Sequence, residues 1–142
     1  MSDPVVANSI VVGVDTSSES IAALRWAAEL ATSTHAHLYA VHAEGLLEEG
    51  SYVPHVDVGN VVARSLSSAD PSITVTSLTE PGSPSDTILR VADRVGATLI
   101  VVGHRGIGAT GSDIGSTALA VVSRSGIPVT VVRGTDPAPP TL

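Results

Sequence analysis

The stretch that decides the fold is Thr98–Thr117, TLIVVGHRGIGATGSDIGST, in which an apolar run is followed by a glycine-rich segment. The apolar run, Thr98–Val102, predicts a buried strand, and the alanine-rich residues from Ala118 onward can continue as a helix. Glycines let main-chain N–H groups approach a ligand closely, and the N-terminus of a helix carries partial positive charge. This order of strand, glycine-rich loop and helix predicts a site for a phosphorylated small molecule, with a nucleotide as the first hypothesis.

Further apolar runs alternate with helical patterns along the rest of the chain. Strands are predicted at 9–14, 37–43, 72–78, 98–102 and 127–133. Helices are predicted at about 21–33 and 56–69, between Ser85 as N-cap and Gly96, and up to Ser125 with Gly126 as C-cap. A turn is predicted at 80–84. Five strands alternating with helices predict an α/β fold with a parallel sheet and right-handed crossovers.

Composition limits the classes of partner. The chain has 142 residues, a net charge of −7, and seven basic residues that are all arginine. An acidic surface repels nucleic acid and anionic lipid, so we expect neither as a partner. The chain has no cysteine, which excludes disulfides and thiolate chemistry and fits a reducing compartment. No lysine is present to build a P-loop, so an anion must be bound by backbone amides and a few arginines.

One domain is expected over residues 9–133, with an N-terminal extension at 1–8 and a disordered tail at 134–142. No apolar run approaches the roughly 20 residues of a membrane span. The first residues, Met1–Pro4, carry no basic region typical of a signal peptide, so we expect a cytoplasmic protein.

The predicted topology places two features at one crevice. Ligands of doubly wound sheets bind beyond the carboxyl ends of the strands, at the point where the winding direction reverses. With strand order 3-2-1-4-5 that point lies between the first and fourth strands, which are followed by Asp15 and Gly103. A carboxylate suits ribose hydroxyl or ring-nitrogen donors, whereas main-chain N–H groups suit phosphate oxygens.

Four segments form a pattern along the chain. They are Val12–Asp15 at the end of the first strand, Ala40–Ala43 in the second, and Gly103–Gly106 followed by Gly115–Thr117 after the fourth. Over roughly residues 8 to 133 the chain resembles the universal stress protein family. The closing segment Ile127–Arg133 is also typical. The resemblance implies a Rossmann-like fold of the adenine nucleotide alpha hydrolase type, with helices on both faces of the sheet.

The resemblance also implies a set of roles for individual residues. Asp15 would hydrogen-bond the adenosine part, and the backbone around Ala43 would face the adenine. The remaining residues would line or bind the phosphates: Gly103, Gly106, Gly115, Ser116 and Thr117. The ligand would be ATP or a related adenine nucleotide with a regulatory role in a stress response, and Mg²⁺ could accompany it. A homodimer is implied, and the strand at 127–133 offers an edge for pairing.

Other interpretations stay open at this point. Asp15 could serve only as a helix cap. Arg105 could contact phosphate or lie in solvent. The loop between Gly106 and Gly115 has eight residues, where the family's ATP-binding signature has nine, and the family also includes members that do not bind ATP. The alternative function is therefore a dimeric protein-interaction module.

Enzymatic turnover is not expected from these residues. Ser116 has no histidine predictably beside it, so no nucleophile and base form a pair. Beyond Asp15 and Asp113 the sequence offers no carboxylate set for tight Mg²⁺ binding. At most, slow ATP hydrolysis is expected.

Overall fold

The computed structural model describes residues 8–45, 55–105 and 113–134. Strands and helices alternate along the chain, as predicted. The strands are β1 (Ser9–Gly13), β2 (His37–Glu44), β3 (Thr74–Pro81), β4 (Leu99–Gly103) and β5 (Val129–Val132). The helices are α1 (Ser18–Thr34), α2 (Val58–Ser65), α3 (Pro84–Val95) and α4 (Ser116–Arg124).

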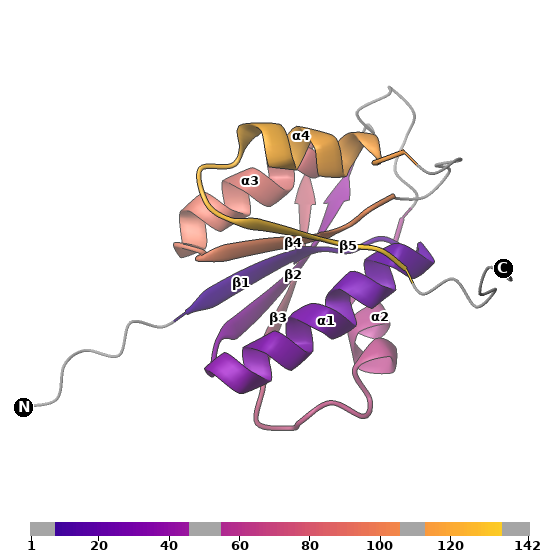
Figure 1. The fold of residues 1–142 in the computed structure, drawn as a ribbon. Helices are drawn as coiled ribbons and strands as arrows, with labels where there is room; N and C mark the ends of the chain where they lie inside the picture. The colour runs from indigo at the N-terminus through magenta and orange to yellow at the C-terminus, as the bar shows by residue number, and fades with distance from the viewer. Residues whose placement is uncertain (1–7, 46–54, 106–112, 135–142) are drawn as a thin grey trace, which may run out of the picture.

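The five strands form one parallel sheet in the order β3-β2-β1-β4-β5, which confirms the predicted topology. Helices α1 and α2 cover one face of the sheet, and α3 and α4 cover the other (Figure 1). Because all neighbouring strands are parallel, the carboxyl ends of the five strands lie at the same edge of the sheet. The first turns of α1 and α4 lie at this edge (Figure 1).

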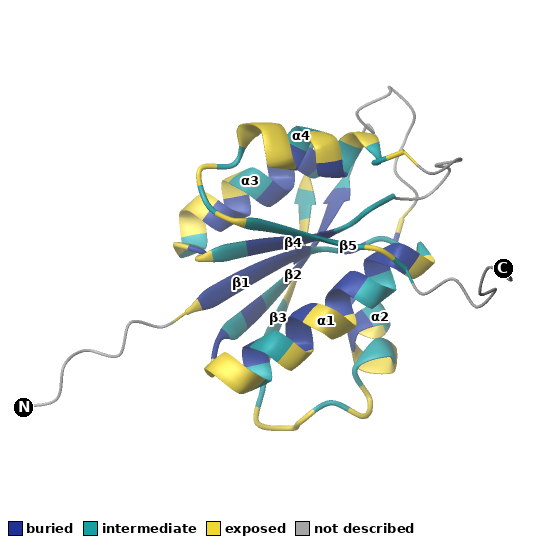
Figure 2. Ribbon diagram, in the orientation of Figure 1, coloured by how far each residue is buried: buried dark blue, intermediate teal, exposed yellow. Residues whose placement is uncertain are grey.

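Alternate residues of the central strand build a core on each face of the sheet. Ile10 and Val12 of β1 pack with α1, whereas Val11 packs with Ile88 and Val91 of α3. All five side chains are buried, because a central strand of a doubly wound sheet is covered on both faces. Burial decreases toward β5, whose residues are all half-buried (Figure 2). This decrease leaves β5 as a partly exposed apolar edge.

The helix ends correct two details of the prediction. The N-cap of α3 is Ser83, which accepts a hydrogen bond from the backbone N–H of Asp86, and Ser85 is fully buried inside the helix. Pro84 is favoured at the first helical position because it lacks an N–H that would be unsatisfied there, so the helix begins before Ser85. Helix α4 ends at Ser125 in an extended conformation, so Gly126 is not a left-handed cap. Gly96 does end α3 with φ 66°, as predicted.

Two elements differ in length from their predictions. The second helix is shorter, because Asp57 caps it and it ends at Ser65. Strand β3 starts later than predicted and continues to Pro81, because its pairing with β2 extends to Glu44. The predicted turn at 80–84 is therefore reduced to Gly82, with φ 126°, and its neighbours.

Some predictions concern residues outside the described ranges. Most of the N-terminal extension, most of the tail and residues 106–112 of the glycine-rich loop belong to this group. Among the described residues, no helix has the length and apolar character that a membrane crossing requires.

Candidate functional site

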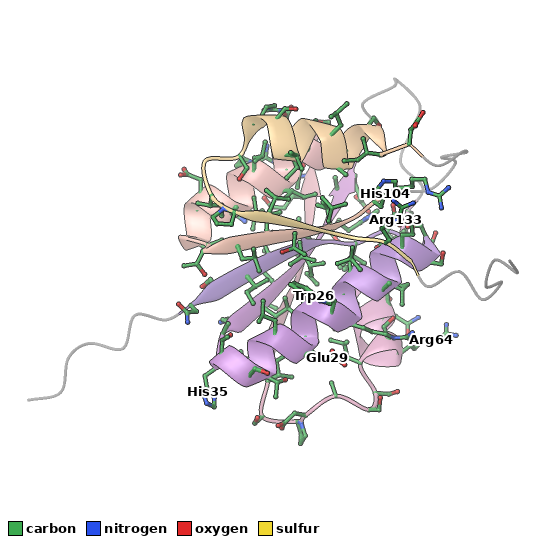
Figure 3. The ribbon with its side chains drawn as sticks, in the orientation of Figure 1. Trp26, Glu29, His35, Arg64, His104 and Arg133 are labelled. Atoms are coloured by element: carbon green, nitrogen blue, oxygen red, sulfur yellow. The ribbon has the colours of Figure 1, made fainter. Side chains whose placement is uncertain are left out.

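Pairing between β1 and β4 brings the two halves of the predicted crevice together. Val12 of β1 lies opposite Val101 of β4, so the residues that follow both strands emerge side by side. Asp15 follows β1, and His104 and Arg105 follow β4. His104 is labelled in Figure 3 at this edge of the sheet, together with Arg133 after β5. The strand-order assumption behind the predicted crevice is thus confirmed.

Asp15 is fixed by the turn that leads into α1. Its Oδ1 accepts a hydrogen bond from the Ser17 N–H at 2.7 Å, and its own N–H donates to Ser20 Oγ at 2.7 Å. The N-cap of α1 is Ser17, whose hydroxyl accepts from the Ser20 N–H. The capping role considered for Asp15 therefore belongs to Ser17. The Asp15 carboxylate, half-buried, is held next to the crevice by a local turn.

The end of β2 is tied to the same turn. The Val14 N–H donates to the Val41 carbonyl at 2.8 Å, and His42 Nδ1 lies 3.0 Å from the Val14 carbonyl, to which a protonated Nδ1 donates. His42 is fully buried, and its Nε2 has no hydrogen-bond partner among the described residues. Ala43, the predicted adenine neighbour, is buried one residue further along. His42 thus helps to hold Val14, the residue before Asp15, a role that the sequence did not reveal.

Gly103 has a packing role that the sequence did not reveal. A Cβ at Gly103 would lie 2.9 Å from the carbonyl carbon of Glu19 and 3.0 Å from the backbone nitrogen of Ser20. The end of β4 therefore touches the backbone of the first turn of α1. A glycine at this position allows the two elements to approach closely, whatever the ligand is.

A polar cluster links the glycine-rich loop to α1. The Glu19 carboxylate, with 9% of its side chain exposed, lies 3.3 Å from Arg105 Nε and 3.9 Å from His104 Nδ1. His104 Nδ1 is itself buried and has no hydrogen-bond partner among the described residues. Arg105 is thus held by Glu19 in this structure, where the sequence offered contact with phosphate or exposure to solvent as alternatives. Glu19 was not predicted as a site residue, because it stands in a polar segment that reads simply as a helix start.

Helix α4 begins at the same edge. Its N-cap is Gly115, which has no side chain to bond the first turn, so the backbone N–H groups of Ser116 and Thr117 receive no hydrogen bond from an N-cap side chain. The Gly115 N–H donates to the His104 carbonyl at 2.7 Å, which fixes the start of α4 beside β4. The predicted residue Gly106 lies outside the described ranges.

The structure therefore gathers seven of the eight predicted residues at the carboxyl edge of β1, β2 and β4. They are Asp15, Ala43, Gly103, Arg105, Gly115, Ser116 and Thr117. Within the described ranges, no group of three or more His, Cys, Asp or Glu side chains could hold a metal ion.

A groove lies away from the candidate site. It has a volume of about 530 Å³ and separates α1 from the end of α2 and the residues that follow it, and Arg25, Glu29, Ser65 and Asp70 are among its lining residues. It contains none of the predicted site residues.

Comparison with known proteins identifies the family. The sequence pattern of the Universal stress protein family matches residues 7–133, which is most of the chain. The chain belongs to the universal stress protein family. No curated protein matches the chain in sequence.

Solved structures of universal stress proteins share its fold. A crystal structure of a universal stress protein in complex with cAMP is 26% identical, with a TM-score of 0.70, and the match covers 91% of this chain and 98% of that one. A universal stress protein from Archaeoglobus fulgidus is also 26% identical, with a TM-score of 0.71, and the match covers 92% of this chain and 45% of that one. Another from Archaeoglobus fulgidus, in complex with dAMP, is 24% identical, with a TM-score of 0.65 and coverage of 91% and 99%.

Proposed function

We propose that this universal stress protein binds an adenine nucleotide, ATP or a relative of it, as a regulatory ligand in a cytoplasmic stress response. The observation that carries the proposal is the juxtaposition of Asp15 with the N-terminus of α4, whose N-cap is the glycine Gly115, across the β1–β4 switch point. The cAMP complex of a family member with 26% identity supports the choice of an adenine nucleotide.

The two ends of the crevice suit the two ends of a nucleotide. The Asp15 carboxylate can accept hydrogen bonds from ribose hydroxyls, and the backbone at the end of β2, around Ala43, can face the adenine edge. The amides of Ser116 and Thr117 can donate to phosphate oxygens, where the dipole of α4 also favours negative charge. The acidic chain thus binds an anion through backbone groups rather than through lysine.

A regulatory ligand fits the site better than a substrate does. The histidine nearest to the start of α4 in the chain is His104, and it faces Glu19. Mg²⁺ would enter only as the companion of a polyphosphate, coordinated by the phosphate oxygens, because the described residues supply no metal-ligand cluster. We therefore expect no efficient turnover and at most slow ATP hydrolysis.

The proposal includes a homodimer that forms through β5. This strand is one edge of the sheet and offers unpaired backbone groups to a second copy. The large hydrophobic side chains exposed among the described residues are Trp26, Leu119 and Val122, with 38%, 52% and 47% exposure.

These three side chains flank β5 on both faces of the sheet. On α4, Ala118 and Val121 are buried and Arg124 reaches Asp86 of α3 at 2.7 Å, so Leu119 and Val122 lie on the flank away from α3. On α1, Trp26 follows Glu19 by two helical turns, on the stripe where the Glu19 side chain lies against Gly134 after β5. An apolar surface that surrounds an open strand edge fits a second copy of this chain.

Calorimetric titration of the full chain tests whether the ligand is an adenine nucleotide. The compounds titrated are adenosine, cAMP, AMP and ATP, with GTP as the control. We expect saturable binding of the adenine compounds that weakens at least about tenfold in Asp15→Ala, which removes hydrogen bonds to a charged acceptor. Gly115→Val should weaken binding as well. Absence of binding at millimolar concentration would overturn the proposal and favour the alternative, a dimeric protein-interaction module.

A further inference from the structure

Glu19 is a buried carboxylate at the place where a phosphate would bind. Its side chain lies beneath His104 and Arg105, the residues that lead into the glycine-rich loop, at 3.9 Å and 3.3 Å. The His104 carbonyl in turn accepts the hydrogen bond from Gly115 at the start of α4. His104 therefore connects Glu19 to Gly115, where the backbone groups proposed to hold phosphate begin.

The carboxylate has little room to move away. A Cβ at Gly134 would lie 2.7 Å from Glu19 Cγ, and one at Gly103 would lie 2.9 Å from the Glu19 carbonyl carbon. Backbone from the ends of β4 and β5 therefore encloses the residue on two sides. A charge held in this way is screened by salt much less than a charge on the surface.

The charges around this edge do not favour a highly charged ligand. The described segments that follow β1, β4 and β5 and precede α4 carry two carboxylates, on Asp15 and Asp113, and two arginines, Arg105 and Arg133, and Glu19 adds a third carboxylate from the first turn of α1. Glu19 neutralises Arg105, and Arg133 is exposed to solvent. Each additional phosphate would add negative charge near Glu19, and among the described arginines of this edge only the solvent-exposed Arg133 is left to compensate it.

We infer that Glu19, by pairing with Arg105, limits the phosphate charge that this site accepts. The preferred ligand is then an adenine nucleotide with a single phosphate, linear or cyclic, rather than a triphosphate. The inference rests on the proposed function and narrows its ligand class. Glu19 acts through Arg105 and through its own field, so it is a specificity-determining residue that need not touch the ligand.

Calorimetry on the native chain, Glu19→Gln and the control Glu29→Gln tests this inference, with adenosine, AMP, cAMP and ATP in a buffer that contains EDTA. Glu29→Gln removes the same charge from an exposed position further along α1 (Figure 3). We expect native protein to bind AMP or cAMP more tightly than ATP. In Glu19→Gln the affinity for ATP relative to AMP should rise about tenfold, because a nearby buried negative charge is gone. The affinity of Glu19→Gln for adenosine should equal that of native protein. In Glu29→Gln the affinity for ATP relative to AMP should also equal the native value.

The inference would be overturned, while the proposed function stands, by either of two results. One is a ratio of ATP affinity to AMP affinity that is the same in native protein and Glu19→Gln. The other is a native protein that binds ATP more tightly than AMP. Failure of native protein to bind adenosine or any of the nucleotides would overturn both. Arg105→Gln gives a second test if Glu19→Gln does not fold, because it leaves the Glu19 charge uncompensated. The ATP-to-AMP ratio should then fall, and an unchanged or higher ratio would contradict the inference.

Discussion

Gly103 lies against the first turn of α1 so closely that a Cβ would come within 2.9 Å of the Glu19 carbonyl carbon. The nearest atoms, which belong to Glu19 and Ser20, are all backbone atoms, so a rotamer change cannot relieve the clash. We expect Gly103→Ala to lower the free energy of unfolding by about 1–3 kcal/mol, the usual cost of overpacking. Urea unfolding measures this change. Gly126→Ala is the matched control, because a Cβ there meets no atom within 4 Å. Equal unfolding midpoints for the two variants would disprove the close approach.

The cap of α3 provides a second stability test. Ser83 Oγ accepts from the Asp86 N–H, so Ser83→Ala leaves a donor of the first turn unsatisfied. The expected loss is about 0.5–2 kcal/mol of unfolding free energy. Ser123→Ala, at an exposed position within α4, should change stability by less than about 0.5 kcal/mol. A Ser83→Ala variant as stable as the native protein would show that α3 does not depend on this cap.

An ion pair between β3 and α3 should make stability depend on pH in acid. The hydrogen bond from Arg94 holds the pKa of the Glu80 carboxyl below its ordinary value of 4.5. Because the pKa is lower in the folded state, the unfolded state binds more protons, and the contribution of the pair is present above pH 4.5 and lost as the pH falls further.

The variant Glu80→Gln should therefore be less stable than native protein in urea unfolding at pH 7. The difference should shrink below about pH 4.5 and then disappear. Arg94→Gln should behave in the same way, since either change removes the pair. A difference that persists unchanged into acid would rule out this ion pair as its cause.

The proposed dimer predicts a change in molecular mass. Val122→Arg places a charge within the exposed apolar surface around β5 and should shift sedimentation from dimer to monomer. Ser68→Arg adds the same charge at an exposed position beyond α2 and should leave the dimer intact. The dimer surface would be misplaced if Val122→Arg sedimented like the native dimer. A native chain that sediments as a monomer would refute the dimer itself.

The strands themselves were predictable, because apolar and mostly β-branched runs such as Ile10–Val12 and Leu99–Val102 leave little choice of element. Their order was assumed from the doubly wound architecture, because the apolar runs do not determine which strands pair. Local rules also placed Gly96 at the end of α3. They failed where two signals competed, as at Ser83 and Ser85, where Pro84 between them decides the cap.

The site was predictable only in part, because some of its residues are fixed by contacts between distant segments. Asp15 and Gly115 follow from the motif and the topology. Glu19 does not, because it acquires its burial and its contact with Arg105 only when β4 packs against α1. The role of His42 could not be predicted either, since its contact with the Val14 carbonyl joins β2 to the residue that follows β1.

The central claim is the location of the nucleotide, and an amide chemical-shift titration of the ¹⁵N-labelled chain with cAMP and AMP tests it most directly. We expect the largest shifts on Asp15, Ala43, Ser116 and Thr117, at the carboxyl edge of the sheet. Shifts concentrated instead on Arg25, Ser65 and Asp70, which line the groove between α1 and the end of α2, would contradict it.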